Sequence, residues 1–333
     1  SPTARGITVT TACCFRFHWN LTPMSQFLYK LRGHRSSVTA TFYTDLTPSS
    51  PPNLLSGDIK GEVRLWSAST RRSSAILPEN GVHILSIQCQ KFFPNQSIIQ
   101  GRDGSITVVD ISSGQIIIFI EKGSSPYTFC RIALNDNGSL YAAPTDSYQL
   151  SIKDYRHKSL SSVVNLNRDN GQCMSLSWVG PDHNLLVGDE SGHIHLYDIR
   201  SLSIPISSLQ LSKTPLFSLL YNPVLEGGIA GSAGRLLYPW QISDNGVEYH
   251  PSIPIHSPGV SNIATRSDYR LFSYSAWDSM AYVYTWKSMR CIAVLDQQSD
   301  KINDITLSRS ESNLAAVSCQ DHTISVYQIG KSR

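Results

Sequence analysis

The chain has 333 residues, a length that suits either two ordinary domains or one large β domain. Hydrophobic residues make up 41% of the chain and charged residues only 16%, which excludes a disordered protein. The 28 basic and 25 acidic residues give a net charge of +3 and form no basic run, so direct nucleic-acid binding is not expected.

Residues 1 to 23 are predicted to form an N-terminal extension, followed by one domain over residues 24 to 333. The extension lacks the layout of a signal peptide. The seven cysteines form an odd set without a CxxC pair, which indicates buried thiols in a reducing compartment. The longest aliphatic and aromatic run, Ile116 to Ile120, is far shorter than the roughly 20 residues that cross a bilayer, so no membrane partner is expected.

A strand pattern at Gln26 to Leu31 precedes seven similar hairpins. The first hairpin, Asn53 to Trp66, has a short strand, a turn with Gly61, and an alternating strand that ends on an aromatic residue. The later hairpins end at Val109, Lys153, Tyr197, Trp240, Tyr284 and Tyr327, 43 or 44 residues apart. This spacing is the period of a four-stranded blade. The sequence therefore predicts an all-β, seven-bladed β-propeller.

Two further expectations follow from the repeat. The turn glycines Gly61, Gly104, Gly192 and Gly234 are expected to adopt a positive φ, with Ser or His in that place in the other blades. The strand over residues 26 to 31 has no blade of its own. We predict that it forms the outermost strand of the last blade and closes the ring, since closure removes an open sheet edge.

Gly33-His34 followed by Val38, with a hairpin ending at Leu65-Trp66, resembles a WD repeat. In such repeats a His, a turn Asp, a strand Ser or Thr and the terminal Trp form a hydrogen-bonded set. The resemblance implies a structural role for six residues: His34, Trp66, Asp103, His256, Asp278 and Asp321. Lys60 stands where blade one would have its turn Asp, and Ser191 stands there in blade four.

Motifs in the C-terminal third narrow the resemblance. They are Gly231 to Trp240, Ser257 to Val260, Ala276-Trp-Asp278 and Tyr284-Thr-Trp286, together with Gly101-Arg-Asp103 and Thr70-Arg-Arg72 nearer the start. These stretches resemble the family of ASTRA-associated protein 1 and of the animal guanine-nucleotide-binding-protein beta-subunit-like protein 1. The similarity runs from about residue 27 to residue 329.

The family resemblance implies a non-catalytic scaffold subunit of the ASTRA complex, a chromatin regulator that is expected in the nucleus and also in the cytoplasm. The implied partners are kinase-maturation co-chaperones that serve phosphatidylinositol-3-kinase-like kinases, RuvB-like ATPases and a kinase-like transcription cofactor. Two other classes stay open. One is a heterotrimeric G-protein β-like signalling subunit, which would need an N-terminal pairing helix that residues 1 to 26 do not indicate. The other is a peptide or histone-tail reader or a ubiquitin-ligase substrate receptor.

Catalytic and metal motifs do not stand out. Neither a nucleophile elbow, a zinc HExxH pattern nor a phosphate loop occurs, so we expect no enzyme, no cofactor and no small-molecule substrate. His193 and His195 are predicted to share one strand face, but a zinc site usually needs three or four protein ligands and no third follows nearby.

The binding surface is predicted from position. In a propeller, the loops that lead into the innermost strands line one rim of the central channel. Arg and Tyr suit interfaces because they combine apolar area with a polar tip. The candidate protein-binding residues are Arg35, Tyr127, Gln172, Lys213 and Pro258.

Overall fold

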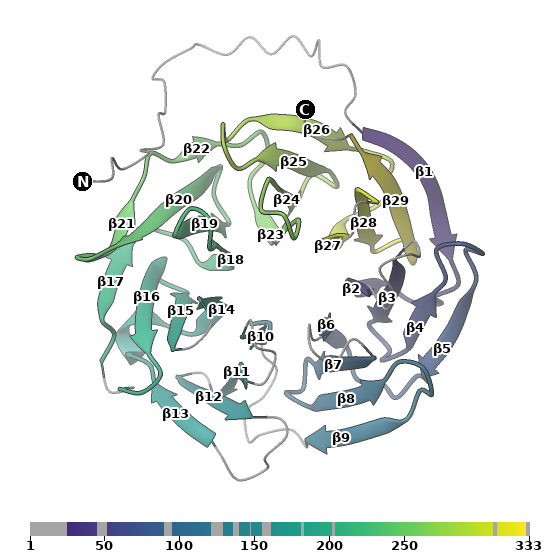
Figure 1. Cartoon of the computed structure of the whole chain (residues 1–333), viewed down its shortest axis with the longest axis horizontal. Helices are drawn as coiled ribbons and strands as arrows, with labels where there is room; N and C mark the ends of the chain where they lie inside the picture. Colours follow the sequence, from purple (N-terminus) through teal and green to yellow (C-terminus); the bar gives the residue numbers. More distant parts are fainter. Residues whose placement is uncertain are drawn as a thin grey trace.

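Seven antiparallel β-sheets stand in a ring around a central channel in the computed structural model (Figure 1). The structure describes residues 25–44, 52–89, 95–120, 129–135, 140–146, 148–154, 161–180, 183–201, 204–308 and 312–330. The predicted seven-bladed β-propeller is thereby confirmed. The extension predicted for residues 1 to 23 lies outside the described residues.

Each blade has four strands that follow one another from the channel to the outside. The innermost strands are β2 (Val38–Thr44), β6 (Ile84–Cys89), β10 (Ala133–Leu134), β14 (Cys173–Val179), β18 (Leu216–Asn222), β23 (Val260–Thr265) and β27 (Ile302–Leu307). The second strands are β3 (Asn53–Asp58), β7 (Gln96–Gly101), β11 (Leu140–Asp146), β15 (Asn184–Asp189), β19 (Gly227–Ser232), β24 (Leu271–Ala276) and β28 (Leu314–Cys319).

The third strands are β4 (Val63–Trp66), β8 (Ile106–Asp110), β12 (Gln149–Asp154), β16 (His193–Asp198), β20 (Leu236–Ser243), β25 (Ala281–Thr285) and β29 (Thr323–Ile329). The outermost strands are β5 (Ser73–Leu77), β9 (Ile116–Ile120), β13 (Ser161–Asn165), β17 (Ser207–Gln210), β21 (Gly246–Tyr249), β26 (Cys291–Leu295) and β1 (Ser25–Arg32). Blade five carries the short extra strand β22 (Ile253–Pro254), and a single 3₁₀ turn, η1 (Arg168–Asn170), precedes blade four. The described residues form no helix long and apolar enough to cross a membrane.

Blade seven is completed by the N-terminal strand. β1 pairs antiparallel with β29, with Ser25 opposite Ile329 and Arg32 opposite Thr323. A register shift between Phe27 and Tyr29 bends β1 around the outside of the blade (Figure 1). The predicted closing strand is therefore confirmed, and it extends one residue beyond the predicted range at each end.

The hydrophobic core lies between the blades. Each of the seven clusters found among the described residues combines side chains from two neighbouring blades. This arrangement explains why β24 and β28 are buried along their whole length, since both of their faces meet an adjacent sheet. A single blade could not cover these surfaces alone.

Hydrogen bonds near the channel also join neighbouring blades. Thr39 Oγ1 donates to Ile84 O at 2.6 Å, and Ser175 Oγ donates to Leu216 O at 2.6 Å. The other five junctions are joined by Gln88 to Ile132 O, Trp178 to Ala133 O, Ile263 N to Ser218, Asn262 to Ile305 O and Thr41 N to Asp304. The innermost strands thus form a hydrogen-bonded ring around the channel.

The turn geometry follows the sequence in most blades. Gly61, Gly104 and Gly192 have φ values of 89°, 84° and 87°, as expected. Ser279 and His322 occupy the same place in blades six and seven, also with positive φ. Gly234 is an exception, because it is not among the described residues with positive φ. Hydrogen bonding of its N–H to Ser232 Oγ, at 3.1 Å, shapes that turn instead.

Candidate functional site

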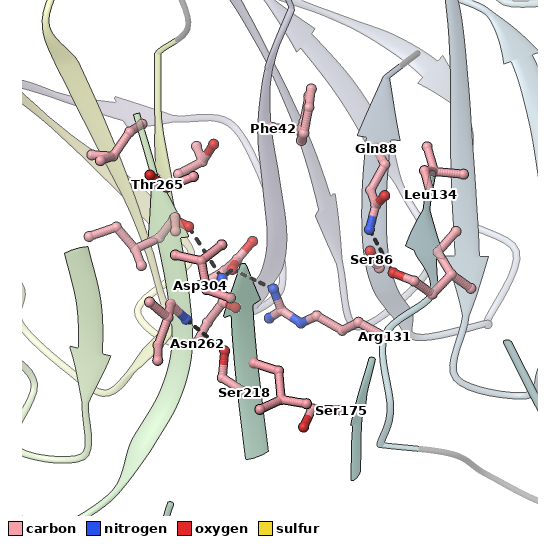
Figure 2. Close-up of a pocket in the computed structure, with 18 of the residues that line it drawn as sticks. Phe42, Ser86, Gln88, Arg131, Leu134, Ser175, Ser218, Asn262, Thr265 and Asp304 are labelled. Carbon is pink, nitrogen blue, oxygen red and sulfur yellow. Dashed lines mark hydrogen bonds and ion pairs between the residues drawn. The ribbon is translucent and has the colours of Figure 1, made fainter. Parts of the chain in front are cut away.

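The innermost strands of all seven blades enclose a cavity of about 880 Å³ at the centre of the ring (Figure 2). Apolar side chains such as Phe42, Leu134 and Phe217 alternate in its wall with polar ones such as Gln88 and Thr265. Among the described residues of the wall, Arg131 and Asp304 are the charged ones.

Asp304 is held at the centre of a hydrogen-bond network. Its side chain is 3% exposed, and it accepts from Thr41 N at 2.7 Å, from Thr41 Oγ1 at 3.3 Å and from Asn262 Nδ2 at 2.6 Å. Arg131, which precedes β10 in blade three, reaches across the cavity to it at 2.6 Å (Figure 2). One carboxylate thereby connects blades one, three, six and seven.

This network limits the chemistry of the cavity. Both carboxylate oxygens of Asp304 already accept two hydrogen bonds each, so neither is free to take a proton from a substrate. The ion pair also leaves the wall without net charge, because Arg131 and Asp304 compensate each other. We interpret the pair as a structural brace of the ring.

Sequence reasoning missed this pair. Arg131 and Asp304 are 173 residues apart, so no local spacing relates them. The available signal was weak: each is a single charged residue beside an apolar strand, Ile132-Ala-Leu134 in one case and Ile305-Thr-Leu307 in the other.

His34 and Trp66 meet in blade one as members of a buried network. Trp66 Nε1 donates to Ser56 Oγ at 2.7 Å, and Ser56 Oγ lies 2.6 Å from His34 Nε2. His34 Nδ1 lies 3.1 Å from Asp58 Oδ2. A neutral His34 with its proton on Nδ1 satisfies all four side chains. The network ties the loop before β2 to the hairpin of β3 and β4.

Asp58 supplies the carboxylate of this network. This corrects the sequence interpretation, which expected the turn Asp of blade one at the position of Lys60 and found none there. Asp58 ends β3, two residues earlier, and its Oδ1 accepts from the backbone N–H groups of Lys60 and Glu62. Burial raises the pKa of the Asp58 carboxyl, but hydrogen bonds, led by that from His34, outweigh burial and bring the pKa below its usual value.

His34, Asp58 and Glu62 place ligand-type atoms within 4.8 Å of one another. However, both ring nitrogens of His34 are already hydrogen-bonded. Glu62 binds the guanidinium of Arg64 with both oxygens, at 2.7 and 2.8 Å. Because a cation at this place would compete with Arg64, we interpret the cluster as structural.

Replacing Ser56 tests the network. Ser56→Ala removes the central hydroxyl and leaves the Trp66 N–H and His34 Nε2 buried without a partner. The expected loss in the free energy of unfolding is about 2 kcal/mol. Urea unfolding of the two variants Ser56→Ala and Ser74→Ala measures it, since Ser74 is exposed on the outer strand of the same blade. Equal midpoints for the two would contradict the assigned role.

The turn aspartates of the other blades stabilise their own turns. Asp103 accepts from Ser105 N and Oγ at 3.1 and 2.7 Å, and Asp321 accepts from Thr323 N at 3.0 Å. Asp278 accepts from Met280 N at 3.0 Å and from Tyr282 Oη at 2.7 Å. His256 differs from the expectation: its side chain is exposed, and its backbone carbonyl accepts from Arg235 Nη1 at 3.1 Å. No bond between His256 and Asp278 appears in the described part of blade six.

Blade four forms a network of its own. The rings of His193 and His195 stack at 5.8 Å, so they share one face as predicted. His195 Nε2 lies 2.8 Å from Asp189 Oδ2, while its Nδ1 lies 2.7 Å from Ser208 Oγ. Asp189 supplies the turn carboxylate of this blade. The sequence interpretation expected that carboxylate two residues later, at the position of Ser191. Both imidazole nitrogens of His195 are thus engaged in holding the hairpin.

The predicted binding residues lie at one end of the propeller. Arg35, Gln172, Lys213 and Pro258 are all exposed in loops that lead into innermost strands. Tyr127 lies outside the described residues. We call this end the entry rim: it comprises these loops and the turns between second and third strands. The two kinds of segment touch, because Ile59 N donates to Ser37 O and Trp277 N donates to Gly259 O.

Large apolar side chains are exposed on the same entry rim. They are Ile59, Phe129, Trp277 and Met280, with exposed fractions of 45%, 60%, 50% and 37%. The guanidinium of Arg102 lies 4.3 Å from the centroid of the Phe129 ring. Sequence reasoning did not select these residues, although Trp277 belongs to a motif that it noted. These side chains give the entry rim exposed apolar area that suits a protein partner, although others, among them Ile204 and Val224, are exposed elsewhere on the described surface.

Comparisons with known proteins agree with this fold. Residues 289–328 match the family model described as WD domain, G-beta repeat. Among solved structures, the β-propeller domain of Cps50 (Swd1) from Myceliophteria thermophila has a TM-score of 0.78 at 12% identity, covering 92% of this chain and 99% of that one. A chain of the mitotic checkpoint complex has a TM-score of 0.77 at 11% identity, covering 99% of both chains. At such identities the likeness concerns the fold alone.

Curated relatives identify the family of the chain more specifically than the fold does. Guanine nucleotide-binding protein subunit beta-like protein 1 from Mus musculus is 26% identical over 90% of this chain and 95% of its own length. ASTRA-associated protein 1 from Verticillium alfalfae is 26% identical over 80% of this chain and 74% of its own length. ASTRA-associated protein 1 from Schizosaccharomyces pombe is 30% identical over 90% of this chain and 98% of its own length. The chain therefore belongs to the ASTRA-associated protein 1 family.

Proposed function

We propose that this chain is a non-catalytic subunit of an ASTRA assembly that binds other proteins through its entry rim. The observation that carries the proposal is the match to relatives named ASTRA-associated protein 1, one of which is covered over 98% of its length. The exposed apolar side chains of the entry rim support a protein partner.

The central cavity supports a role without catalysis. Asp304, the one carboxylate in the described part of its wall, is fully hydrogen-bonded and paired with Arg131. General acid or base catalysis needs a titratable group within reach of a substrate proton, and this carboxylate is engaged. We therefore place the function of the chain on its surface.

We further propose that the assembly takes part in maturing phosphatidylinositol-3-kinase-like kinases, alongside RuvB-like ATPases, and in chromatin regulation by way of a kinase-like transcription cofactor. A nuclear location with a cytoplasmic share would suit both tasks. Support for these finer statements comes from the family resemblance. Fractionation of cells with antibody detection of the chain tests the location, and its absence from nuclei would contradict that part.

Affinity purification from native extract, followed by mass spectrometry, tests the proposed function. The full chain should co-purify with ASTRA subunits. Recovery of G-protein γ subunits without ASTRA subunits would instead support the signalling alternative and overturn the proposal.

A pair of charge reversals in blade one tests the entry rim. Arg35→Glu alters the loop before β2, whereas Arg72→Glu alters an exposed residue in the turn between β4 and β5, at the opposite end of the blade. We expect Arg35→Glu to reduce recovery of ASTRA subunits and Arg72→Glu to leave it unchanged, because rim charges contribute to association. Equal recovery with both variants would contradict the assignment of the rim.

A further inference from the structure

An apolar and basic patch lies on the entry rim where blades five and six meet. We define the Trp277 patch as Lys213, Arg235, Pro258, Trp277 and Met280, all of which are exposed. Trp277 and Met280 belong to the turn between β24 and β25, while Lys213 and Pro258 belong to the loops that lead into β18 and β23.

The indole of Trp277 is held in place from below. A Cβ atom at Gly259 would lie 2.0 Å from Trp277 Cδ2, so the ring rests directly on the glycine backbone. Trp277 N donates to Gly259 O at 3.2 Å, and the ring of Phe217 lies 6.0 Å from the indole. The exposed half of Trp277 is therefore preorganised, which lowers the entropic cost of binding.

Arg235 is connected to the same platform. Gly234 O accepts from Gly259 N at 3.0 Å, which joins the turn that carries Arg235 to the loop beneath Trp277. Arg235 Nη1 donates to His256 O at 3.1 Å, an interaction that positions the guanidinium without neutralising it. Lys213 lies on the same rim, in the loop that leads to β18 and Phe217.

The cations of the patch are available to a partner. Among the described residues, the lysines and arginines that form ion pairs are Lys30, Arg64, Arg131, Arg200 and Arg266. Neither Lys213 nor Arg235 belongs to this group. The nearby Asp278 is partly buried and its oxygens are engaged by Met280 N and Tyr282 Oη. The patch thus combines an exposed indole with two unpaired positive charges.

We propose that the Trp277 patch binds an acidic segment of a partner protein, with an apolar side chain on the indole and carboxylates facing Lys213 and Arg235. This inference rests on the proposed protein-binding function and specifies the chemistry of one partner. Tryptophan is enriched among the residues that dominate binding energy, and complementary charge favours and orients the encounter.

Retention of the full chain on immobilised peptide pools tests the proposal. Peptides of about fifteen residues are drawn from Asp, Glu, Leu and Pro in the first pool, from Lys, Arg, Leu and Pro in the second, and from Ser, Gln, Leu and Pro in the third. We expect retention on the acidic pool alone, weakening as salt rises. Equal retention on all three pools, or stronger retention on single-stranded DNA than on the acidic pool, would overturn the proposal.

Three variants locate the binding site. Trp277→Ala should weaken retention roughly tenfold or more. Lys213→Glu combined with Arg235→Glu should abolish it, while Lys287→Glu combined with Arg290→Glu makes the same charge change at the opposite end of blade six and should leave it intact. Loss with the control pair, or binding by Trp277→Ala at the level of the unaltered chain, would contradict the assigned site.

The outcome is separable from that of the proposed function. If ASTRA subunits co-purify equally with the unaltered chain and with Trp277→Ala, and the chain is not retained on the acidic pool, the patch proposal fails while the proposed function stands. If the acidic pool binds through Trp277 but ASTRA subunits are not recovered, the patch proposal stands and the proposed function fails.

Discussion

Deletion of residues 25 to 32 is expected to lower the thermal midpoint of the propeller by roughly 10 °C or more. The deletion removes the buried Leu31 side chain, worth about 2 kcal/mol, and strand hydrogen bonds worth about 1 kcal/mol each. It also exposes the edge of β29, which then offers unpaired N–H and C=O groups to other molecules. Calorimetry and light scattering of the full and shortened chains measure both effects.

Two substitutions within β1 serve as a matched control. Leu31 is 5% exposed and Leu28 is 37% exposed on the same strand. Leu31→Ala should cost about 2 to 5 kcal/mol, whereas Leu28→Ala should leave the midpoint nearly unchanged. An unaltered midpoint after deletion of the whole strand would mean that β1 does not close the ring.

Substitution of Asp304 is the second change that is expected to lower the free energy of unfolding strongly. Asp304→Ala leaves the Arg131 guanidinium without its carboxylate and removes the acceptor of Thr41 N and Asn262 Nδ2. Breaking a buried ion pair costs about 3 to 5 kcal/mol. Arg131 is 29% exposed, so water can replace part of the lost interaction, and about 3 kcal/mol is expected. Urea unfolding measures the change.

The exposed ion pair of Arg200 and Asp198 provides the comparison. Its atoms also lie 2.6 Å apart, but the Arg200 side chain is 66% exposed. Arg200→Ala should therefore leave the urea midpoint nearly unchanged, because water and salt screen an exposed pair. Raised salt should leave the Asp304 contribution largely intact, since a buried pair is poorly screened. Similar losses for Asp304→Ala and Arg200→Ala would contradict the role of Asp304 as a brace.

Local sequence patterns were sufficient to predict the seven-bladed architecture, because each blade repeats the same short-range features. The hairpin from Asn53 to Trp66 shows alternating side chains and a Gly61 turn, and both features act between residues close in the chain. Gly234 shows the limit of such reasoning, since a hydrogen bond to Ser232 shapes that turn without a positive φ.

The side-chain networks could not be predicted in full, because the order of residues in the chain does not give the distances between side chains of different loops and strands. Asp58 rather than Lys60 faces His34 because β3 ends with its carboxylate toward the loop before β2. The same shift occurs in blade four, where Asp189 faces His195. A register argument places a residue on a strand face, but whether its side chain reaches a loop from another part of the chain is a tertiary property.

Seven blades and a closing strand follow from the sequence alone, because hydrophobic alternation acts between neighbours in the chain and the pattern recurs every 43 or 44 residues. The sequence also indicated the family, through motifs that remain contiguous in the chain. The meeting of Arg131 and Asp304 across the channel, and the packing of Trp277 on Gly259 next to the turn that carries Arg235, emerge only in the three-dimensional fold. Arg131 and Asp304 belong to separate blades, which ring closure brings within contact distance, whereas Gly259 and Trp277 meet because the loop before β23 folds against the turn of its own blade.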